Sequence, residues 1–395
     1  MHDLTQCVHH PTVSEEGFAS LGVATHRAST IVFDSAQAYA DRHQRGPDGY
    51  SYGLYGTPTS RTLEKQLTLL HGGLRSVLLP SGQAAIAAVM LSVLRPGDSV
   101  LVPACVYPPV LALCRNLLAE HQIRHTVYDP LCGERIVEFL EASTKLVWVE
   151  SPGSTSLEVQ DLPAIAGAAH RSGIPVGCDN TWASPLLCKP LTLGADFVVE
   201  ALTKYAGGHS DLLLGSVTVA DAANDQRLRS WVRALGIGVS PDDCALALRG
   251  METMGVRIAH VGRIAADIAN KLRHSPAVRN VCHPAEPNHP GHRIFKRDFK
   301  GASGLFSVEL NALAVPFLAT ALDRLKFFAI GASWGGTRSL LAPITLASHA
   351  DQPGSPEART FLRISIGLED PDDLWEDLNS VFFDLERHIR ENSPP

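Results

Sequence analysis

Two residues in the stretch 174–211 have the chemical types and the placement for covalent chemistry. The apolar run IPVGC ends at Asp179, and a second run, ADFVVE, leads to Lys204 between Thr203 and Tyr205. A lysine that follows an apolar, strand-like run and precedes small residues is expected to be desolvated, which lowers the pKa of its amine towards neutrality. A neutral amine can form a Schiff base with an aldehyde.

The pairing of this amine with an acid indicates a cofactor. Pyridoxal phosphate (PLP) needs a Schiff-base lysine and a carboxylate that keeps its ring nitrogen protonated. Asp179 and Lys204 therefore predict a PLP site. The competing interpretation is that Asp179 caps a turn and Lys204 is a surface lysine.

Apolar strand-like runs alternate with helical patterns from about residue 58. The runs at 77–80, 98–104, 145–151, 174–179, 195–200 and 211–219 predict strands, and 62–73, 81–94, 108–122 and 162–173 predict helices. Apolar strands separated by helices are typical of an α/β fold, here with a mostly parallel central sheet and helices on both faces. Ligands in such folds bind beyond the carboxyl ends of the strands, where Ser81, Tyr107, Ser151, Asp179 and Lys204 are expected.

Three parts of the chain differ in pattern. Residues 1–57 lack a sustained period and predict an arm that contacts a neighbouring subunit, with a short extended segment at 27–35. Residues 58–245 form the predicted cofactor-binding α/β domain. Residues 246–395 predict a smaller α+β domain, because a helical stretch is followed by a loop rich in His and Pro and by new strand patterns.

Composition excludes several classes of protein. A net charge of −7 and a sequence pI near 6.2 argue against a nucleic-acid surface. The start MHDLTQCVHH has no signal-peptide pattern and no apolar run reaches about 18 residues, so we expect a cytoplasmic protein without a membrane segment. The eight cysteines contain no CxxC pair, which predicts no metal site, and Cys178 is expected to serve packing.

The turn Ser81-Gly82-Gln83 and the ring of Tyr107 are candidates for cofactor binding. The turn follows a strand and opens a helix, so its backbone N–H groups suit a phosphate, although a plain Ser N-cap would explain it too. Tyr107 follows a strand and precedes Pro108. Its ring could stack on a planar cofactor or pack half-buried against protein.

Arg363 lies inside the apolar run FLRISIGL and needs an anionic partner. A substrate carboxylate would satisfy its planar guanidinium with two hydrogen bonds. The alternative is an internal salt bridge with Glu369 or Asp370.

The motifs together resemble a known family. RASTIVFDS, YGLYGTPT, SGQAA, VYPP, ESPGS, DNTWASP, ALTKYAGGHSD, SWGG and FLRISIGLED span nearly the whole chain. They resemble the PLP-dependent enzymes of Cys/Met metabolism, the trans-sulfuration group of PLP fold type I. This resemblance implies a fold type I structure and PLP as cofactor.

The resemblance also implies a role for each matching residue. Lys204 would be the Schiff-base lysine, Asp179 would pair with the pyridinium nitrogen, and Tyr107 would stack on the ring. The phosphate would be bound by Ser81, Gly82, Gln83 and Thr203, and by Tyr52 of a neighbouring subunit. Arg363, Ser333 and Trp334 would hold the substrate, within a homotetramer built as a dimer of dimers with shared active sites.

Two positions depart from the family pattern. Leu54 stands where relatives commonly carry a phosphate-binding arginine, and Ala201 stands where a serine is frequent. Arg61 is a candidate to compensate for Leu54.

Within the family, ESPGS at 150–154 and Trp334 resemble the β-lyases. The implied reaction is β-elimination of L-cystathionine to homocysteine, pyruvate and ammonia, with related cysteine thioethers or cystine as further substrates. The alternatives are a cystathionine γ-lyase, a γ-synthase or a methionine γ-lyase of the same family. A reading from another class is a catalytically silent PLP-binding scaffold protein.

Overall fold

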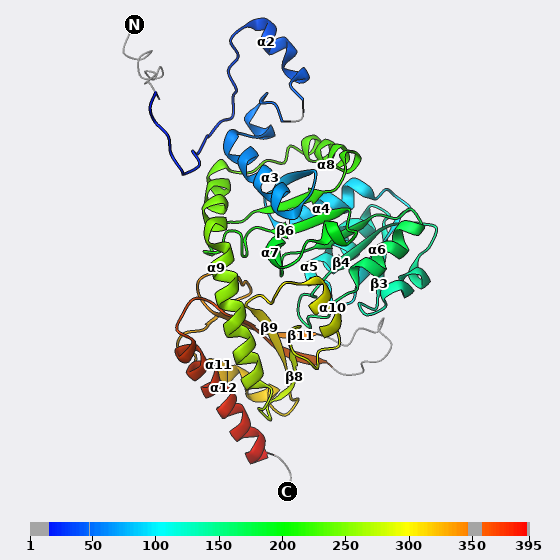
Figure 1. Cartoon of the computed structure of the whole chain (residues 1–395). Helices are drawn as coiled ribbons and strands as arrows, with labels where there is room; N and C mark the ends of the chain where they lie inside the picture. The colour runs from blue at the N-terminus through cyan, green and yellow to red at the C-terminus, as the bar shows by residue number, and fades with distance from the viewer. Residues whose placement is uncertain (1–15, 47, 347–357, 393–395) are drawn as a thin grey trace.

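The computed structural model describes residues 16–46, 48–346 and 358–392. Figure 1 shows three parts in succession: an N-terminal arm at one end, a larger sheet with its helices in the middle, and a smaller sheet with the C-terminal helix at the other end. Within the described ranges, none of the helices combines the length and hydropathy that a membrane crossing requires.

The larger sheet has seven strands in the order β1-β7-β6-β5-β4-β2-β3. Strand β7 runs opposite to the other six strands and is antiparallel to both of its neighbours, β1 and β6, so the predicted mostly parallel sheet is confirmed. The strands are β1 (Arg75–Leu79), β2 (Ser99–Pro103), β3 (Arg124–Tyr128), β4 (Thr144–Glu150), β5 (Val176–Asp179), β6 (Phe197–Ala201) and β7 (Gly215–Val219).

Helices cover both faces of this sheet because its strands are apolar on both sides. Along β4, Trp148 packs on the face covered by α4 (Gly82–Val93), α5 (Pro108–Leu113) and α8 (Ala222–Ala234). The neighbouring Val147 and Val149 pack on the opposite face, against α6 (Leu162–Arg171). This doubly covered sheet matches the expected α/β class.

The smaller sheet has five strands in the order β10-β11-β12-β9-β8. Its strands are β8 (Val278–Cys282), β9 (Leu305–Leu310), β10 (Ala329–Ile330), β11 (Leu340–Leu346) and β12 (Arg359–Ser365). The helices near it are α10 (His292–Asp298), α11 (Leu318–Leu322) and α12 (Pro371–Asn392). Strand β12 is central and antiparallel to both neighbours, so Arg363 lies within the sheet.

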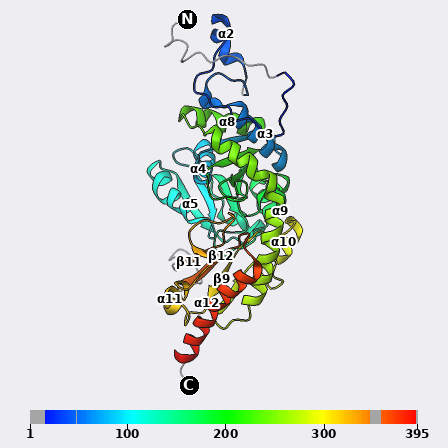
Figure 2. The same cartoon turned by 90° about the vertical axis from the view of Figure 1, so that its left-hand side faces the viewer.

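Helix α9 (Pro241–Leu272) joins the two sheets and runs beside both (Figures 1 and 2). The buried side chains of α9 belong to one apolar core together with those of α3 (Pro58–His71) and of the strands of the smaller sheet. The predicted boundary between residues 245 and 246 falls in the first turns of α9. The division at 57/58 and 245/246 stays a prediction.

The arm has almost no core of its own. None of the described residues 16–56 is buried, helix α2 (Ala36–Ala40) included, and Leu21, Val32 and Phe18 are among its exposed apolar side chains. Residues 1–15 and 47 of the predicted arm lie outside the described residues. The stretch 27–35, expected to be extended, forms no strand. Its bonds to the rest of the chain include that from the Gly53 N–H to the Ser29 carbonyl, 2.7 Å, and the ion pair of Arg27 with Asp242.

Two details of the predicted elements differ from the structure. Strand β3 was not predicted, because RHTVY carries charge and is only partly buried at the edge of the sheet. Residues 211–214 do not join the strand predicted at 211–219, since β7 begins at Gly215 and Leu213 is 68% exposed.

The described cysteines are free and buried. Cys178 is 1% exposed, and burial raises the pKa of its thiol well above the ordinary value. It is therefore a packing residue, as expected.

Candidate functional site

The amine of Lys204 lies just past the end of β6 and is partly buried. The Lys204 N–H donates to the carbonyl of Ala201, 3.0 Å, and Nζ donates to Oγ of Ser333, 2.8 Å. Burial lowers the pKa of this amine to about 8, aided by the positive charge of Arg363 and opposed by Asp179. Desolvation was the effect expected from the apolar run before Lys204.

Asp179 ends β5, the strand next to β6. Its Oδ1 accepts the N–H of Thr181 at 2.9 Å, and Thr181 Oγ1 in turn accepts the N–H of Ala201 at 2.9 Å. Burial raises the pKa of Asp179, and the hydrogen bonds from Thr181 oppose that rise. Thr181 therefore ties the acid to the strand that delivers Lys204, a link that the sequence does not reveal.

Glu150 is a second buried acid that the sequence analysis did not single out. It ends β4 in register with Asp179, and its Oε2 accepts the N–H of Tyr107 at 2.7 Å. Burial and the neighbouring Asp179 raise the pKa of Glu150 well above its ordinary value. The sequence feature that could have revealed Glu150 is its position at the end of the apolar run KLVWV, where a carboxyl group is stable only if it is neutral or hydrogen-bonded.

The turn at Ser81 opens α4 beside the end of β6. Ser81 Oγ accepts the N–H of Ala84 at 3.1 Å, so this serine is an N-cap. A Cβ on Gly82 would lie 2.6 Å from Cβ of Ala201, so only glycine permits this approach. The hydroxyl of Thr203 donates to the carbonyl of Leu214 at 3.2 Å and accepts its N–H at 3.1 Å.

Arg363 reaches the same region from the smaller sheet. It is 8% exposed, and its Nη2 donates to the carbonyl of Ala332 at 2.5 Å. Among the residues described, no carboxylate forms an ion pair with Arg363, and Glu369 instead accepts the N–H and hydroxyl of Ser339. The internal salt bridge weighed for Arg363 is therefore absent from the described chain, which leaves the guanidinium able to bind an anion.

These side chains surround one cavity of about 210 Å³. Of the residues predicted for the site, those that line it are Ser81, Gly82, Gln83, Tyr107, Asp179, Thr203, Lys204, Trp334 and Arg363. Ser333 joins them through its bond to Lys204, and Nζ lies 5.3 Å from the centre of the Trp334 ring. The structure thus brings together residues from both sheets.

Tyr52 does not line this cavity. It is 47% exposed on the arm, and its ring meets that of Tyr55 edge-on with centres 6.3 Å apart. Its predicted role in a neighbouring subunit therefore stays a prediction.

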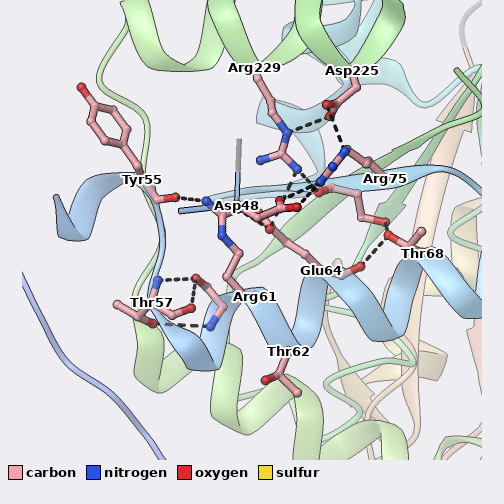
Figure 3. A network of polar contacts seen from close by, with 12 residues as sticks. Asp48, Tyr55, Thr57, Arg61, Thr62, Glu64, Thr68, Arg75, Asp225 and Arg229 are labelled. Carbon is pink, nitrogen blue, oxygen red and sulfur yellow. Dashed lines mark hydrogen bonds and ion pairs between the residues drawn. The ribbon is translucent and has the colours of Figure 1, made fainter. Parts of the chain in front are cut away.

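Arg61 takes part in a network of polar and charged groups (Figure 3), and it is not among the residues that line the cavity. Its Nη1 donates to Glu64 Oε2 at 2.5 Å, its Nη2 donates to the carbonyl of Tyr55 at 2.5 Å, and Arg229 also lies 4.0 Å from Glu64. The bond to Tyr55 joins the arm to α3, whereas the contact between Arg229 and Glu64 joins α8 to α3. The idea that Arg61 replaces the family's phosphate arginine at Leu54 gains no support from them.

The chemistry of the cavity fits PLP. A partly neutral amine, a buried acid, a helix N-terminus with glycine at its first position and a tyrosine 40% exposed are the groups that such a cofactor requires.

Comparison with known proteins agrees with this set of groups. The family model for "Cys/Met metabolism PLP-dependent enzyme" matches residues 4–383. The chain belongs to this family. PLP is therefore its cofactor, and the chain is an enzyme.

Individual members of the Cys/Met metabolism PLP-dependent family are similar over most of the chain. A putative cystathionine β-lyase of Rhizobium johnstonii is 41% identical over 90% of this chain and 89% of its own length. The cystathionine β-lyase MetC of Escherichia coli is 39% identical over 90% and 92%. A cystathionine γ-synthase structure from Xanthomonas oryzae pv. oryzae has a TM-score of 0.84 and 32% identity over 94% and 95%. The fold is that of PLP fold type I.

Proposed function

We propose that this enzyme is a cystathionine β-lyase. It cleaves L-cystathionine and water to homocysteine, pyruvate and ammonia, and it acts on related cysteine thioethers or cystine. The observation that carries the proposal is the Lys204 amine, with a pKa of about 8, in a cavity that also holds Asp179 and a buried Arg363 that no acid among the described residues pairs with. The names of relatives at 39–41% identity favour β-elimination over the γ-reactions.

Lys204 is the residue that moves the proton. PLP, when bound, supplies an electron-withdrawing ring that accepts the electron pair released at the substrate Cα. With a pKa near 8, Lys204 is available as the general base for the Cα proton and then as the acid for the departing sulfur. Ser333, 2.8 Å from Nζ, orients the amine between these two steps.

Arg363 and the strand ends hold the reactants. Arg363 binds the substrate α-carboxylate, because its planar guanidinium lies at the cavity and its charge has no acid partner within residues 16–46, 48–346 and 358–392. Trp334 forms part of the same wall and limits the substrate side chain. Asp179 would keep a proton on the ring nitrogen of bound PLP, and the positive charge there would offset the burial that raises the pKa of this acid.

The remaining cofactor contacts are assigned in the same way. Tyr107 would stack on the ring, and the N–H groups at Ser81, Gly82 and Gln83 would hold the phosphate together with Thr203, whose hydroxyl also bonds to Leu214.

Tyr52 supplies a phosphate contact to a neighbouring subunit of a homotetramer built from two dimers. The exposed apolar side chains of the arm support such packing. A cytoplasmic location stays our expectation.

Product analysis tests the proposed reaction. Incubation of the purified holoenzyme with L-cystathionine should release pyruvate and homocysteine in equal amounts. Formation of 2-oxobutyrate and cysteine would instead indicate a γ-lyase. Retention of PLP without turnover of any thioether amino acid would indicate a catalytically silent PLP-binding protein.

Substitution of the lysine tests the assignment of the base. Lys204→Ala should abolish the visible absorption of lysine-bound PLP and the release of pyruvate. A Lys204→Ala protein that retained full activity would refute the assignment.

A further inference from the structure

Arg257 of α9 is a buried cation beside the turn that carries Lys204. It is 7% exposed, and no acidic side chain forms an ion pair with it in the part of the chain that the structure describes. Burial lowers the pKa of its guanidinium. A buried charge without a counter-ion costs free energy unless hydrogen bonds compensate for the lost hydration.

Those partners are backbone oxygens and one hydroxyl. Nη2 donates to the carbonyl of Tyr205 at 2.9 Å and to that of Gly250 at 2.7 Å, while Nε donates to Thr253 Oγ1 at 3.0 Å. Tyr205 directly follows Lys204, whereas Gly250 and Thr253 belong to α9 itself. The guanidinium therefore connects the turn after Lys204 to a long helix that spans both sheets (Figure 1).

The rest of the turn packs on the same guanidinium. The N–H of Gly208 donates to the carbonyl of Lys204 at 2.7 Å, which closes the turn. Gly208 has φ +73°, and a Cβ there would lie 2.0 Å from Nη1 of Arg257. The turn is thus held by Arg257 at Tyr205 through a hydrogen bond and at Gly208 through direct packing.

A second glycine, Gly250, brings α9 close to the turn. A Cβ on Gly250 would lie 2.2 Å from the carbonyl oxygen of Gly207 and 2.3 Å from that of Ala206. Helix and turn are therefore in contact along the whole segment 205–208, and a displacement of either moves the backbone of Lys204.

We infer that Arg257 is a positioning residue for Lys204: through the Tyr205 carbonyl and the Gly208 turn it holds the backbone from which the amine reaches the cofactor. This inference rests on the proposed role of Lys204. Its consequence is that Arg257, which does not line the cavity, governs the orientation of Nζ between Ser333 and the substrate.

The test uses holoenzyme variants and two readouts. Arg257→Met removes the guanidinium, Arg257→Lys retains a charge with fewer donors, and Arg263→Met is the control, an exposed arginine on the same helix. The first readout is the pH titration of the visible absorption of lysine-bound PLP, and the second is the separation of kcat from KM with L-cystathionine. Thermal unfolding is recorded alongside.

For Arg257→Met we expect a shift in the titration midpoint of at least about 0.5 pH unit and a fall in kcat of about tenfold or more, with KM changed by less than about threefold. Arg257→Lys should lie between Arg257→Met and the wild type, and Arg263→Met should match the wild type. Gly250→Ala, which pushes the turn while it leaves Arg257 in place, should reproduce the Arg257→Met shift. If Arg257→Met does not fold, Arg257→Lys tests the inference through the same two readouts.

Lower thermal stability with an unchanged titration and kcat would overturn the inference, because a merely structural arginine would give that result. The titration requires no turnover, so it tests Arg257 even if L-cystathionine is not the substrate. A wild-type protein that binds PLP without lysine-bound absorption would instead overturn the proposed role of Lys204, and with it this inference.

Discussion

The lowered pKa of Lys204 predicts how the apoprotein takes up PLP as pH changes. The amine must be neutral to attack the PLP aldehyde, and its pKa is about 8 where an ordinary lysine has 10.5. At pH 7 about one amine in ten is then neutral, against about one in three thousand for an ordinary lysine, a gain of roughly 300-fold. Burial contributes most to this shift, followed by the charge of Arg363.

Stopped-flow mixing of apoprotein with PLP measures this effect. The rate at which the visible absorption of lysine-bound PLP appears should rise with pH up to about 8 and then level off. Free Nα-acetyl-lysine, measured in the same buffers, corrects for the ionisation of PLP itself. Arg363→Met should move the midpoint of this pH profile to higher pH, because the positive charge of Arg363 disfavours the protonated amine in the wild type.

One outcome would refute the reasoning. If the uncorrected rate for the apoprotein still rose above pH 9 in parallel with the rate for Nα-acetyl-lysine, Lys204 would have an ordinary pKa. Burial would then not lower the pKa of Lys204, and its proposed role as general base would lose its physical basis.

Three further predictions concern the walls of the cavity. Arg363→Ala should lower kcat/KM for L-cystathionine, by an amount that corresponds to a loss of about 2–4 kcal/mol in transition-state binding. An unchanged kcat/KM would contradict the proposed role of Arg363. Glu150→Gln keeps an acceptor for the Tyr107 N–H and should leave the unfolding free energy, measured in denaturant titrations, nearly unchanged. Glu150→Ala removes the acceptor and should lower the unfolding free energy by about 1–3 kcal/mol. Equal losses in the two variants would show that this hydrogen bond does not stabilise the protein. Gly82→Ala places a Cβ 2.6 Å from Cβ of Ala201 and should speed PLP release on dilution, and retention equal to wild type would show that α4 can shift without cost.

Several parts of the site could be predicted from local sequence. Asp179 and Lys204 follow apolar runs, and the runs became adjacent parallel strands β5 and β6 whose carboxyl ends lie at the same edge. Strands that are buried on both faces can be predicted from sequence because nearly every residue along them is apolar. The edge strand β3 escaped this reading since its RHTVY pattern is only partly buried.

Other parts depended on contacts between distant segments. Thr181 bridges the strands of Asp179 and Lys204, and Glu150 holds the Tyr107 backbone across 43 positions. Such partners are chosen by three-dimensional packing, which local patterns do not encode.

The sequence by itself determined the types of reactive group and the strand ends that present them, because apolar runs and the residues that end them are local features. Only the tertiary structure decided what state those groups are in. Ser333 meets the Lys204 amine from 129 positions away, and Arg363 comes from the second sheet without an acid partner in the described chain. Burial and charge act through space, so the pKa of about 8 that makes Lys204 a base arises only once both sheets enclose it.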